Sequence, residues 1–311
     1  MDMYQKRKIR AEKKKDDSPK SFPSVGINWY PGHMTKAKRK IQASLNLVDA
    51  VAEIVDARIP KSSRNPDLDE ILSRKPRIIL LNKCDMANGA MTDSWINYYK
   101  SMGVTAIAVD CKSGKGLKSF IAQVRSLLNE KIEKAKSRGI LNKSLRIMVV
   151  GIPNVGKSSF INRMSKEKKA KVEDRPGVTR GNQWFSIGQN VELLDTPGVL
   201  WPKFEDPEVG EKLAFCGAVK DQVVDIEGLA SRLLRFLCEN GYTGNLINRY
   251  KLNADTLSGN ASGHDILKEI GKKRGMLLSK NEIDIERAAI TVLDEFREAK
   301  LGKFTLDFPE K

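Results

Sequence analysis

The chain has 311 residues, of which 40% are hydrophobic and 30% are charged, and it carries a formal net charge of +16. This length predicts about two domains, and no apolar run approaches the roughly 20 residues that a membrane helix needs, so we expect no membrane partner. Four cysteines without a C-x-x-C pair and only two histidines argue against a zinc site and favour a reducing, cytoplasmic location.

The positive charge is concentrated in residues 1–205, whereas residues 206–311 have a small negative balance. Such a field favours polyanions, most obviously RNA or DNA, although a basic solubility surface is the alternative. Residues 1–26 form a lysine-rich tail with few apolar side chains, and we expect this tail to be disordered. It has no apolar segment typical of a secretory signal, and it either touches nucleic acid or is simply solvated.

From residue 27 onward, helical and strand patterns alternate. The helical stretches repeat apolar residues at a spacing of three to four, and the strands are short apolar runs. The predicted strands cover 51–55, 77–81 and 105–109, and the predicted helices cover 34–47, 68–73, 95–102 and 116–137.

A linker at 139–144 precedes a buried strand at 145–150, which runs into Gly151-Ile-Pro-Asn-Val-Gly-Lys-Ser158. This segment fits G-x-x-x-x-G-K-[ST], the P-loop pattern, and a helix is expected at 157–164. Its glycines let backbone N–H groups surround phosphate oxygens, Lys157 adds a charge at the β- and γ-phosphates, and Ser158 offers a hydroxyl to Mg²⁺. A ligand-free glycine-rich turn is the alternative. The predicted phosphate-binding residues are Pro153, Asn154, Val155, Gly156, Lys157, Ser158 and Ser159.

The guanine-reading motif lies upstream of the P-loop, at Asn82-Lys-Cys-Asp85, which fits N-K-x-D and follows a predicted strand. The Asp85 carboxylate can accept hydrogen bonds from N1 and the exocyclic amine of guanine, whereas adenine would leave it unpaired. Lys83 can lie over the base, and Asn82 can brace the neighbouring loops. The next strand ends at Asp110-Cys-Lys-Ser-Gly114, so Asp110, Cys111 and Lys112 are predicted to support the base through a backbone amide.

A predicted hairpin of strands 183–187 and 191–194 ends at Asp195-Thr-Pro-Gly198, which fits D-x-x-G. Asp225-Ile-Glu-Gly228 fits the same pattern, but only the first copy ends a strand that follows the P-loop. There Asp195 can hold a Mg²⁺-bound water, and the Gly198 amide can sense the γ-phosphate. Thr179, between the P-loop and Asp195, is predicted to close over Mg²⁺ and the γ-phosphate.

After residue 207 the strand signals fade, and helices are predicted at 226–240, 262–271 and 281–298. The fold class is therefore α/β: a P-loop GTPase with a mainly parallel, Ras-like sheet covered on both faces, followed by a smaller all-α C-terminal domain. The predicted divisions are a basic tail at 1–26, a GTPase domain at 27–205 and a helical domain at 206–311, to which the resemblance described next assigns RNA and ribosome binding.

Ras-like GTPases place the P-loop first and N-K-x-D near the end, so the order here indicates a circular permutation joined near 139–144. With these motifs the chain resembles the circularly permuted GTPases typified by bacterial ribosome biogenesis GTPase A, also called YlqF. The resemblance covers nearly all of Ile27 to Phe308. It also rests on Trp29-Tyr-Pro-Gly-His-Met34, Asp56-Ala-Arg-Ile-Pro60, Asn65-Pro66, Gly271-Lys-Lys-Arg-Gly275 and Asp284-Ile-Glu-Arg-Ala-Ala289.

The resemblance implies a monomeric GTP hydrolase that acts late in maturation of the large ribosomal subunit. It implies that the particle stimulates hydrolysis and that the helical domain and basic surfaces contact ribosomal RNA. Val199 occupies the position where Ras has its water-orienting Gln. The family implies His33 as a replacement, with a structural helix cap as the alternative, and it implies that Asn154 helps to coordinate K⁺.

Two other functions compete with this hypothesis. One is an RNA-binding module that uses GTP as a structural ligand with negligible turnover, which the slow hydrolysis expected from Val199 keeps open. The other is a GTPase partnered with a tRNA-modifying or membrane system, which we rank last. Because Asp195 to Pro207 leads directly into the helical domain, we also expect the nucleotide state to bias how that domain docks.

Overall fold

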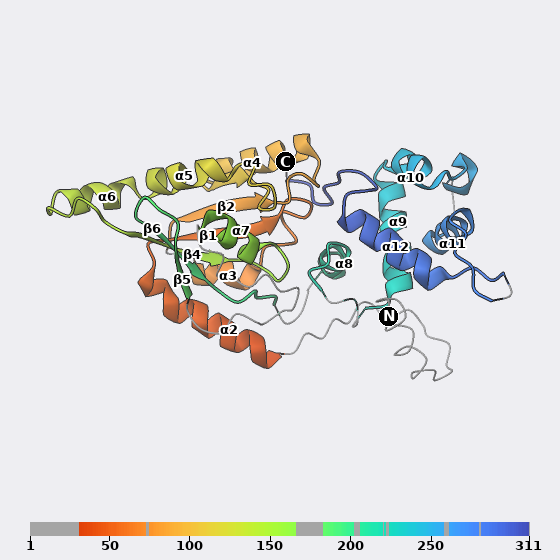
Figure 1. Cartoon of the computed structure of the whole chain (residues 1–311), viewed down its shortest axis with the longest axis horizontal. Coiled ribbons are helices and arrows are strands. Elements are labelled where there is room, and N and C mark those ends of the chain that lie inside the picture. Colours follow the sequence, from red (N-terminus) through yellow and green to blue (C-terminus); the bar gives the residue numbers. More distant parts are fainter. Residues whose placement is uncertain are drawn as a thin grey trace.

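In the computed structural model, residues 31–72, 75–165, 183–201, 206–219, 221, 224–257, 261–279 and 281–310 are described (Figure 1). They contain a six-stranded sheet in the order β3-β2-β1-β4-β6-β5. All neighbours are parallel except β5, which pairs antiparallel with β6 at one edge. The α/β fold class is thereby confirmed. The strands are β1 (Ala50–Asp56), β2 (Arg77–Asn82), β3 (Thr105–Ala108), β4 (Leu145–Val150), β5 (Gln183–Ser186) and β6 (Val191–Asp195).

Helices cover both faces of the sheet, and β1 illustrates how the sequence allows this. Ala52 and Ile54 belong to a buried cluster with α5 (Phe120–Leu127) and α7 (Lys157–Met164). On the opposite face, Val51 packs with α2 (Pro31–Ser44) and α3 (Pro66–Leu72). Val55 packs on that same face with α4 (Gly89–Ser101). Because strand side chains alternate between faces, a strand buried on both sides is mostly apolar. The polar exception in the middle of β1 is the buried Glu53, which is paired with Arg64 and Arg77.

One predicted helix is interrupted. Residues 116–137 form a short 3-10 turn (Leu117–Ser119), α5 and α6 (Asn129–Lys136) instead of one continuous helix. The break is at Leu128, whose backbone leaves the helical region with φ −106° and ψ 16°. No glycine or proline marks it; the Leu128 side chain is buried in the core at this point, so the cause is tertiary packing.

The second part of the chain is helical, and α9 packs against both α11 and α12. Asp225 caps the start of α9 by accepting from the backbone N–H of Gly228. The second D-x-x-G match is therefore a helix cap, which justifies choosing the first. Neither α8 nor α10 was predicted from the sequence. The helices are α8 (Pro207–Phe215), α9 (Ile226–Glu239), α10 (Thr243–Tyr250), a 3-10 turn (Ala254–Leu257), α11 (Gly263–Lys273) and α12 (Ile285–Arg297).

The segment after α12 returns to the sheet part. The Leu306 backbone N–H donates to the Arg58 carbonyl at 2.7 Å, and the Trp95 indole N–H donates to the Asp307 carbonyl at 3.1 Å. Leu306 and Asp307 were assigned to the helical domain from sequence, yet they lie against the sheet part of the chain. The division between the two domains at 205/206 remains a prediction. None of the helices within the described ranges is long and apolar enough to cross a membrane.

Candidate nucleotide-binding site

The P-loop joins the end of β4 to the start of α7, as the sequence predicts. Gly156 precedes α7 with φ +104°, which other residues rarely adopt, and an added Cβ would lie 2.2 Å from Nδ2 of Asn82. At Gly198 a Cβ would lie 2.9 Å from the backbone nitrogen of Pro153. Only glycine therefore lets the P-loop, the base-reading loop and the D-x-x-G segment approach this closely.

Lys157 begins α7 and points into the loop, where its ammonium donates to the carbonyls of Gly151 at 3.1 Å and Ile152 at 2.7 Å. Burial lowers the pKa of Lys157 to about 8, while the nearby Asp195 carboxylate acts in the opposite direction. The next two positions, Ser158 and Ser159, are half-buried in the first turn of α7, where helix N–H groups favour an anion. Asn154 is exposed at the loop, with φ +59°.

Asp195 ends β6 and is 4% exposed. Burial raises the pKa of its carboxyl, and the Lys157 charge opposes that shift. Its Oδ1 is buried and has no hydrogen-bond partner within the described residues. A buried carboxylate oxygen of this kind fits a divalent cation or its bound water, which is the chemistry expected for Mg²⁺ beside a P-loop.

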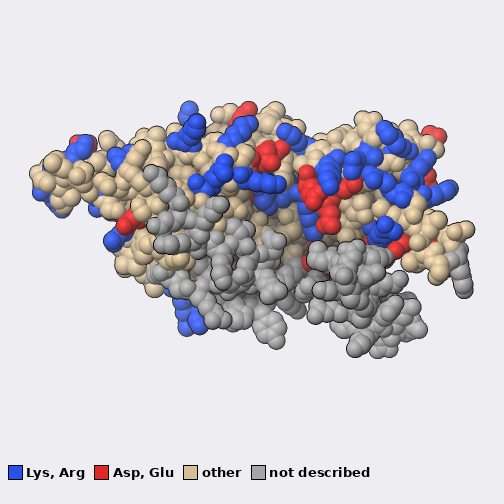
Figure 2. All heavy atoms as spheres, viewed as in Figure 1, with Lys and Arg blue, Asp and Glu red and all other residues tan. Residues whose placement is uncertain are grey.

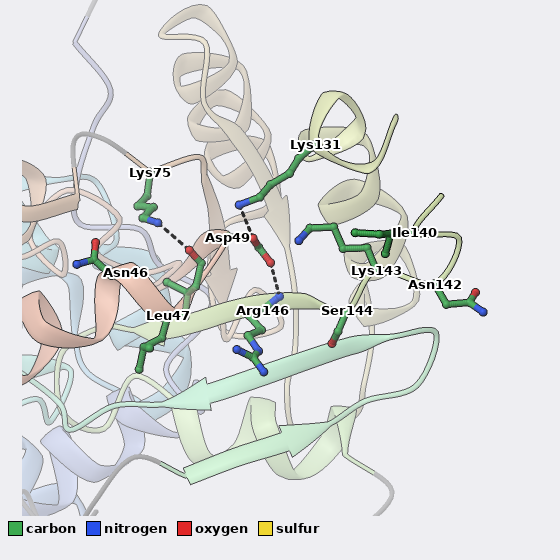
Figure 3. A pocket seen from close by; sticks show the side chains of 11 residues that line it. Asn46, Leu47, Asp49, Lys75, Lys131, Ile140, Asn142, Lys143, Ser144 and Arg146 are labelled. Carbon is green, nitrogen blue, oxygen red and sulfur yellow. Dashed lines mark hydrogen bonds and ion pairs between the residues drawn. The ribbon is translucent and has the colours of Figure 1, made fainter. Parts of the chain in front are cut away.

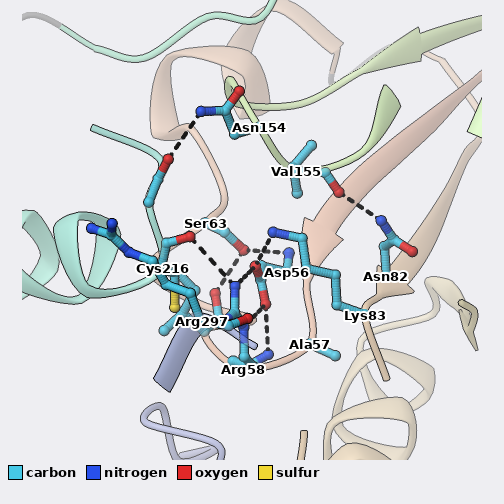
Figure 4. Close-up of polar contacts among 12 residues, drawn as sticks. Asp56, Ala57, Arg58, Ser63, Asn82, Lys83, Asn154, Val155, Cys216 and Arg297 are labelled. Carbon is cyan, nitrogen blue, oxygen red and sulfur yellow. Dashed lines mark hydrogen bonds and ion pairs between the residues drawn. The ribbon is translucent and has the colours of Figure 1, made fainter. Parts of the chain in front are cut away.

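The base-reading motif follows β2. Asn82 connects two loops. Its side-chain amide donates to the Val155 carbonyl at 2.7 Å (Figure 4). Its side-chain oxygen accepts from the Cys111 N–H at 3.0 Å. Asp85 is partly buried, and its Oδ1 has no partner in the part of the chain that the structure covers. An unsatisfied carboxylate oxygen here fits the N–H donors of guanine.

The third loop begins after β3. Asp110 folds it back on itself: its carboxylate accepts from the Lys112 N–H at 2.8 Å, and its own N–H donates to the Lys115 carbonyl at 3.0 Å. Burial raises the pKa of Asp110, but the hydrogen bonds outweigh it and the net pKa is lowered. Through Cys111 and Asn82 this loop meets the P-loop, so the three predicted segments form one site.

Two predicted residues are not placed. Thr179 lies outside the described residues, and so does the side chain of His33, although the His33 backbone belongs to the first turn of α2. Val199 is 4% exposed and packs in the core with Leu194 and Met148. It is fixed there by an amide hydrogen bond from Asn65 to its carbonyl, at 3.1 Å.

Sequence reasoning missed the contacts between this site and the helical part. Asn154 donates its side-chain amide to the Gly217 carbonyl at 3.0 Å, just beyond α8 (Figure 4). Lys83 makes an ion pair with Asp56, which is itself bound to Arg58. The only signal was the family motif Asp56-Ala-Arg-Ile-Pro60, to which no function had been attached.

A separate hollow of about 430 Å³ lies beside the linker at 140–144 and contains none of the predicted nucleotide residues (Figure 3). Its basic side chains are engaged locally: Lys131 pairs with Asp49, and Lys75 donates to the Val48 carbonyl at 2.7 Å. We therefore place the candidate site at the P-loop and not in this hollow.

Several known proteins are similar to this chain. A family model described as 50S ribosome-binding GTPase matches residues 146–241. A Priestia megaterium protein named ribosome biogenesis GTPase A is 46% identical over 289 residues, covering 92% of this chain and 98% of that protein. A Thermotoga maritima protein of the same name is 31% identical over 284 residues, covering 91% and 95%. The crystal structure of GNP-bound YlqF from T. maritima matches with a TM-score of 0.60 and 27% identity, over 89% of this chain and 99% of that one.

Proposed function

The chain belongs to the ribosome biogenesis GTPase A family, and from this premise we propose how its residues serve a GTPase that acts in ribosome assembly. The observation that carries the proposal is the pair of buried, unsatisfied carboxylate oxygens on Asp85 and Asp195. In sheet order they lie on either side of β4, which carries the P-loop. The oxygen of Asp85 suits the N–H donors of guanine, and the oxygen of Asp195 suits Mg²⁺.

We assign the binding roles accordingly. Asp85 accepts from the guanine N1 and 2-amino groups, Lys83 lies along the base, and the loop of Asp110, Cys111 and Lys112 supports it. The P-loop surrounds the phosphates, and Lys157 contacts the β- and γ-phosphates. Ser158 and Asp195 hold Mg²⁺, with Thr179 as a further ligand; bound Mg²⁺ neutralises the charge that develops on the phosphates.

For hydrolysis, the buried and apolar Val199 side chain is unable to orient water. We propose that His33 orients the attacking water and that the intrinsic rate is low. We further propose that Asn154 contributes its side-chain oxygen to a K⁺ ion beside the phosphates. The cation would add charge stabilisation of the kind that an arginine supplies in other GTPases.

For the partner, we propose a precursor of the large ribosomal subunit whose binding stimulates hydrolysis. Residues 27–205 would act as the GTPase domain, 206–311 as the ribosome-binding domain and 1–26 as a basic tail. Figure 2 has Lys and Arg side chains over both the sheet part and the helical part, and α11 ends with exposed Lys272 and Lys273. These charges suit ribosomal RNA. A GTP-dependent RNA-binding module without turnover is not favoured, because the relatives are named as GTPases.

Base specificity tests the nucleotide assignment. In Asp85→Asn the side chain gains an amide N–H, which matches the C2 carbonyl of xanthine and clashes with the 2-amino donor of guanine. We expect GDP affinity to fall by at least about 100-fold and xanthosine diphosphate affinity to rise, because a mismatched polar pair in a desolvated site is costly. Unchanged GDP affinity would refute the assignment of Asp85.

Multiple-turnover GTP hydrolysis with purified subunits tests the partner. We expect precursor large subunits to accelerate phosphate release and small subunits to have no effect. The acceleration should need GTP and should disappear in Lys157→Ala. Equal stimulation by both subunits would contradict the proposed partner while leaving the GTPase activity intact.

A further inference from the structure

The ammonium of Lys83, in the base-reading motif, is anchored to a buried acid. Its Nζ lies 2.9 Å from Oδ2 of Asp56, whose side chain is only 3% exposed. The two residues are brought together by the sheet, because Asp56 at the end of β1 is in register with Asn82 at the end of β2. Lys83 itself follows β2 with φ +60°, a conformation that turns the chain sharply at this residue.

Asp56 is held from the other side by Arg58. The guanidinium donates through Nε to Oδ1 at 2.9 Å and through one terminal nitrogen to Oδ2 at 2.7 Å, and the Arg58 backbone N–H also reaches Oδ1 at 3.0 Å (Figure 4). Burial alone would raise the pKa of Asp56, but the charges of Arg58 and Lys83 hold it well below its usual range. A two-pronged contact of this kind fixes the carboxylate in orientation as well as in charge.

Arg58 also reaches the helical part. Its terminal nitrogens lie 3.4 Å from the carbonyls of Cys216, at the end of α8, and Arg297, at the end of α12. A cation at the carbonyl end of a helix is favourable, because the helix dipole places partial negative charge there. A continuous set of contacts therefore runs from Lys83 through Asp56 and Arg58 to the ends of two helices.

We propose that Asp56 is a positioning residue of the guanine site, which fixes the Lys83 side chain where the base is bound, and that Arg58 makes this position depend on docking of the helical part. The inference rests on the proposed function, because it takes guanine nucleotide as the ligand. By thermodynamic linkage, guanine nucleotide stabilises the docked helical part by the same factor by which docking strengthens nucleotide binding.

A double-mutant cycle on the full chain tests this, with GDP affinity measured by fluorescence of a labelled GDP. Asp56→Asn should weaken GDP binding by about tenfold, the effect of roughly one charge-assisted hydrogen bond. Lys83→Met should weaken it at least as much. If Asp56 acts through Lys83, the combined variant should bind no more weakly than Lys83→Met alone. If Asp56 has a purely structural role, the losses of GDP affinity in the two single variants should instead multiply in the combined variant, and that result overturns the proposal. A wild-type GDP affinity in Asp56→Asn also overturns it.

Two further variants keep the test decisive. Arg58→Lys retains a cation beside Asp56 and serves as the substitute if Asp56→Asn does not fold. In that case the proposal requires that Arg58→Lys lowers GDP affinity in the wild-type background and has no effect in the Lys83→Met background. Asp69→Asn is the matched control, because Asp69 is also paired with two arginines, Arg64 and Arg77, which lie outside the nucleotide motifs. Its GDP affinity should equal that of the wild type. Failure of the wild-type chain to prefer GDP over ADP would refute the proposed function itself, whereas a clear preference combined with multiplying losses refutes this inference alone.

Discussion

Asn154 of the P-loop donates its side-chain amide to the carbonyl of Gly217, 3.0 Å away in the helical part. The three carbonyls before it also accept from side chains. Arg58 donates to the carbonyl of Cys216, and Arg297 donates to the carbonyls of Phe215 and Ala214. The carbonyl end of α8 is therefore held by three side chains, one of which belongs to the phosphate-binding loop. We therefore predict that a change of the P-loop on nucleotide binding alters the contacts at the end of α8, which begins shortly after the D-x-x-G segment.

Asn154→Ala should abolish a dependence of GTP hydrolysis on the monovalent cation. The wild type is expected to turn over faster in K⁺ than in Na⁺, since only the larger ion suits the proposed site formed by the Asn154 oxygen and the phosphates. Steady-state phosphate release in the two salts measures this. Asn190→Ala is the control, because Asn190 is likewise an exposed asparagine with positive φ but lies in the β5–β6 turn. Equal wild-type rates in both salts would remove the K⁺ proposal.

The lowered pKa of Lys157 predicts proton uptake when nucleotide binds. With a pKa of about 8 in the free protein, Lys157 is mostly neutral near pH 9, and the phosphates should restore its charge. Calorimetric titration with GDP in buffers of different ionisation enthalpy should give about one proton taken up near pH 9, whereas near pH 6 Lys157 is already charged and contributes no uptake. Cys84→Ser should leave this value unchanged, and uptake that persists in Lys157→Met would show that another group is responsible.

The same shift affects folding with a definite sign. Because the pKa of Lys157 is lower in the folded state than in the unfolded chain, the group opposes folding below about pH 8. This opposition should disappear as the pH rises from about 8 to about 10.5. Lys157→Met should therefore raise the free energy of unfolding at neutral pH, as measured by urea titration. The difference between this variant and the wild type should shrink at alkaline pH.

His33→Ala should lower kcat by about 100-fold while GTP affinity stays the same, because a water-orienting group acts on the chemical step and not on binding. Single-turnover hydrolysis and nucleotide titration separate the two effects. His264→Ala is the natural control, since His264 is the other histidine of the chain and lies exposed on α11. A variant of His33 with normal kcat would restore the helix-cap interpretation.

Reversing the charges at the end of α11 should weaken binding to the large subunit. Lys272→Glu/Lys273→Glu is expected to reduce co-sedimentation with the particle and to flatten its salt dependence, because phosphate contacts are lost. Lys134→Glu/Lys136→Glu makes the same change of net charge at the end of α6, far from the helical part (Figure 1). If both variants lose binding equally, the attraction is a property of overall charge and not of α11.

Asp307→Ala should destabilise the fold by about 3 kcal/mol. The buried carboxylate accepts from the Ser62 N–H at 2.6 Å, from the Ser62 hydroxyl at 2.9 Å and from Lys212 at 3.0 Å. Its removal leaves both Ser62 donors without this acceptor, while Lys212 keeps its pair with Glu208. Glu310→Ala, in the same segment, removes an exposed pair with Lys61 and should leave the free energy of unfolding nearly unchanged. Urea titration of both variants makes the comparison.

The sequence predicted the elements that flank the P-loop well, because the motif requires fixed residue types at fixed spacings between a strand and a helix. The helix at 157–164 and the strand at 145–150 were predicted with the bounds that the structure has. Helices α8 and α10 were missed; each carries a glycine, Gly210 and Gly244, within the helix, and glycine has a low helix propensity. The break at Leu128 has no local signal either, because packing against the sheet causes it.

What the sequence did not reveal about the site is non-local. Asp56 and Lys83 are neighbours only through strand register, and Asn154 meets Gly217 only after the helical part has docked. Local patterns identify which loops bind phosphate and base, but they say nothing about which helix end those loops will touch. That information comes from tertiary packing alone.

The return of residues 304–310 to the loop after β1 has a consequence for biosynthesis. The Asp307 carboxylate accepts a hydrogen bond from the N–H of Ser62, which precedes it by 245 residues. The Leu306 N–H donates to the carbonyl of Arg58. During translation the sheet part emerges first and can begin to fold, yet this loop lacks its last hydrogen bonds until the end of α12 has left the ribosome. The loop that carries Arg58 would thus be completed only when these residues arrive, which couples completion of this loop to synthesis of the helical part.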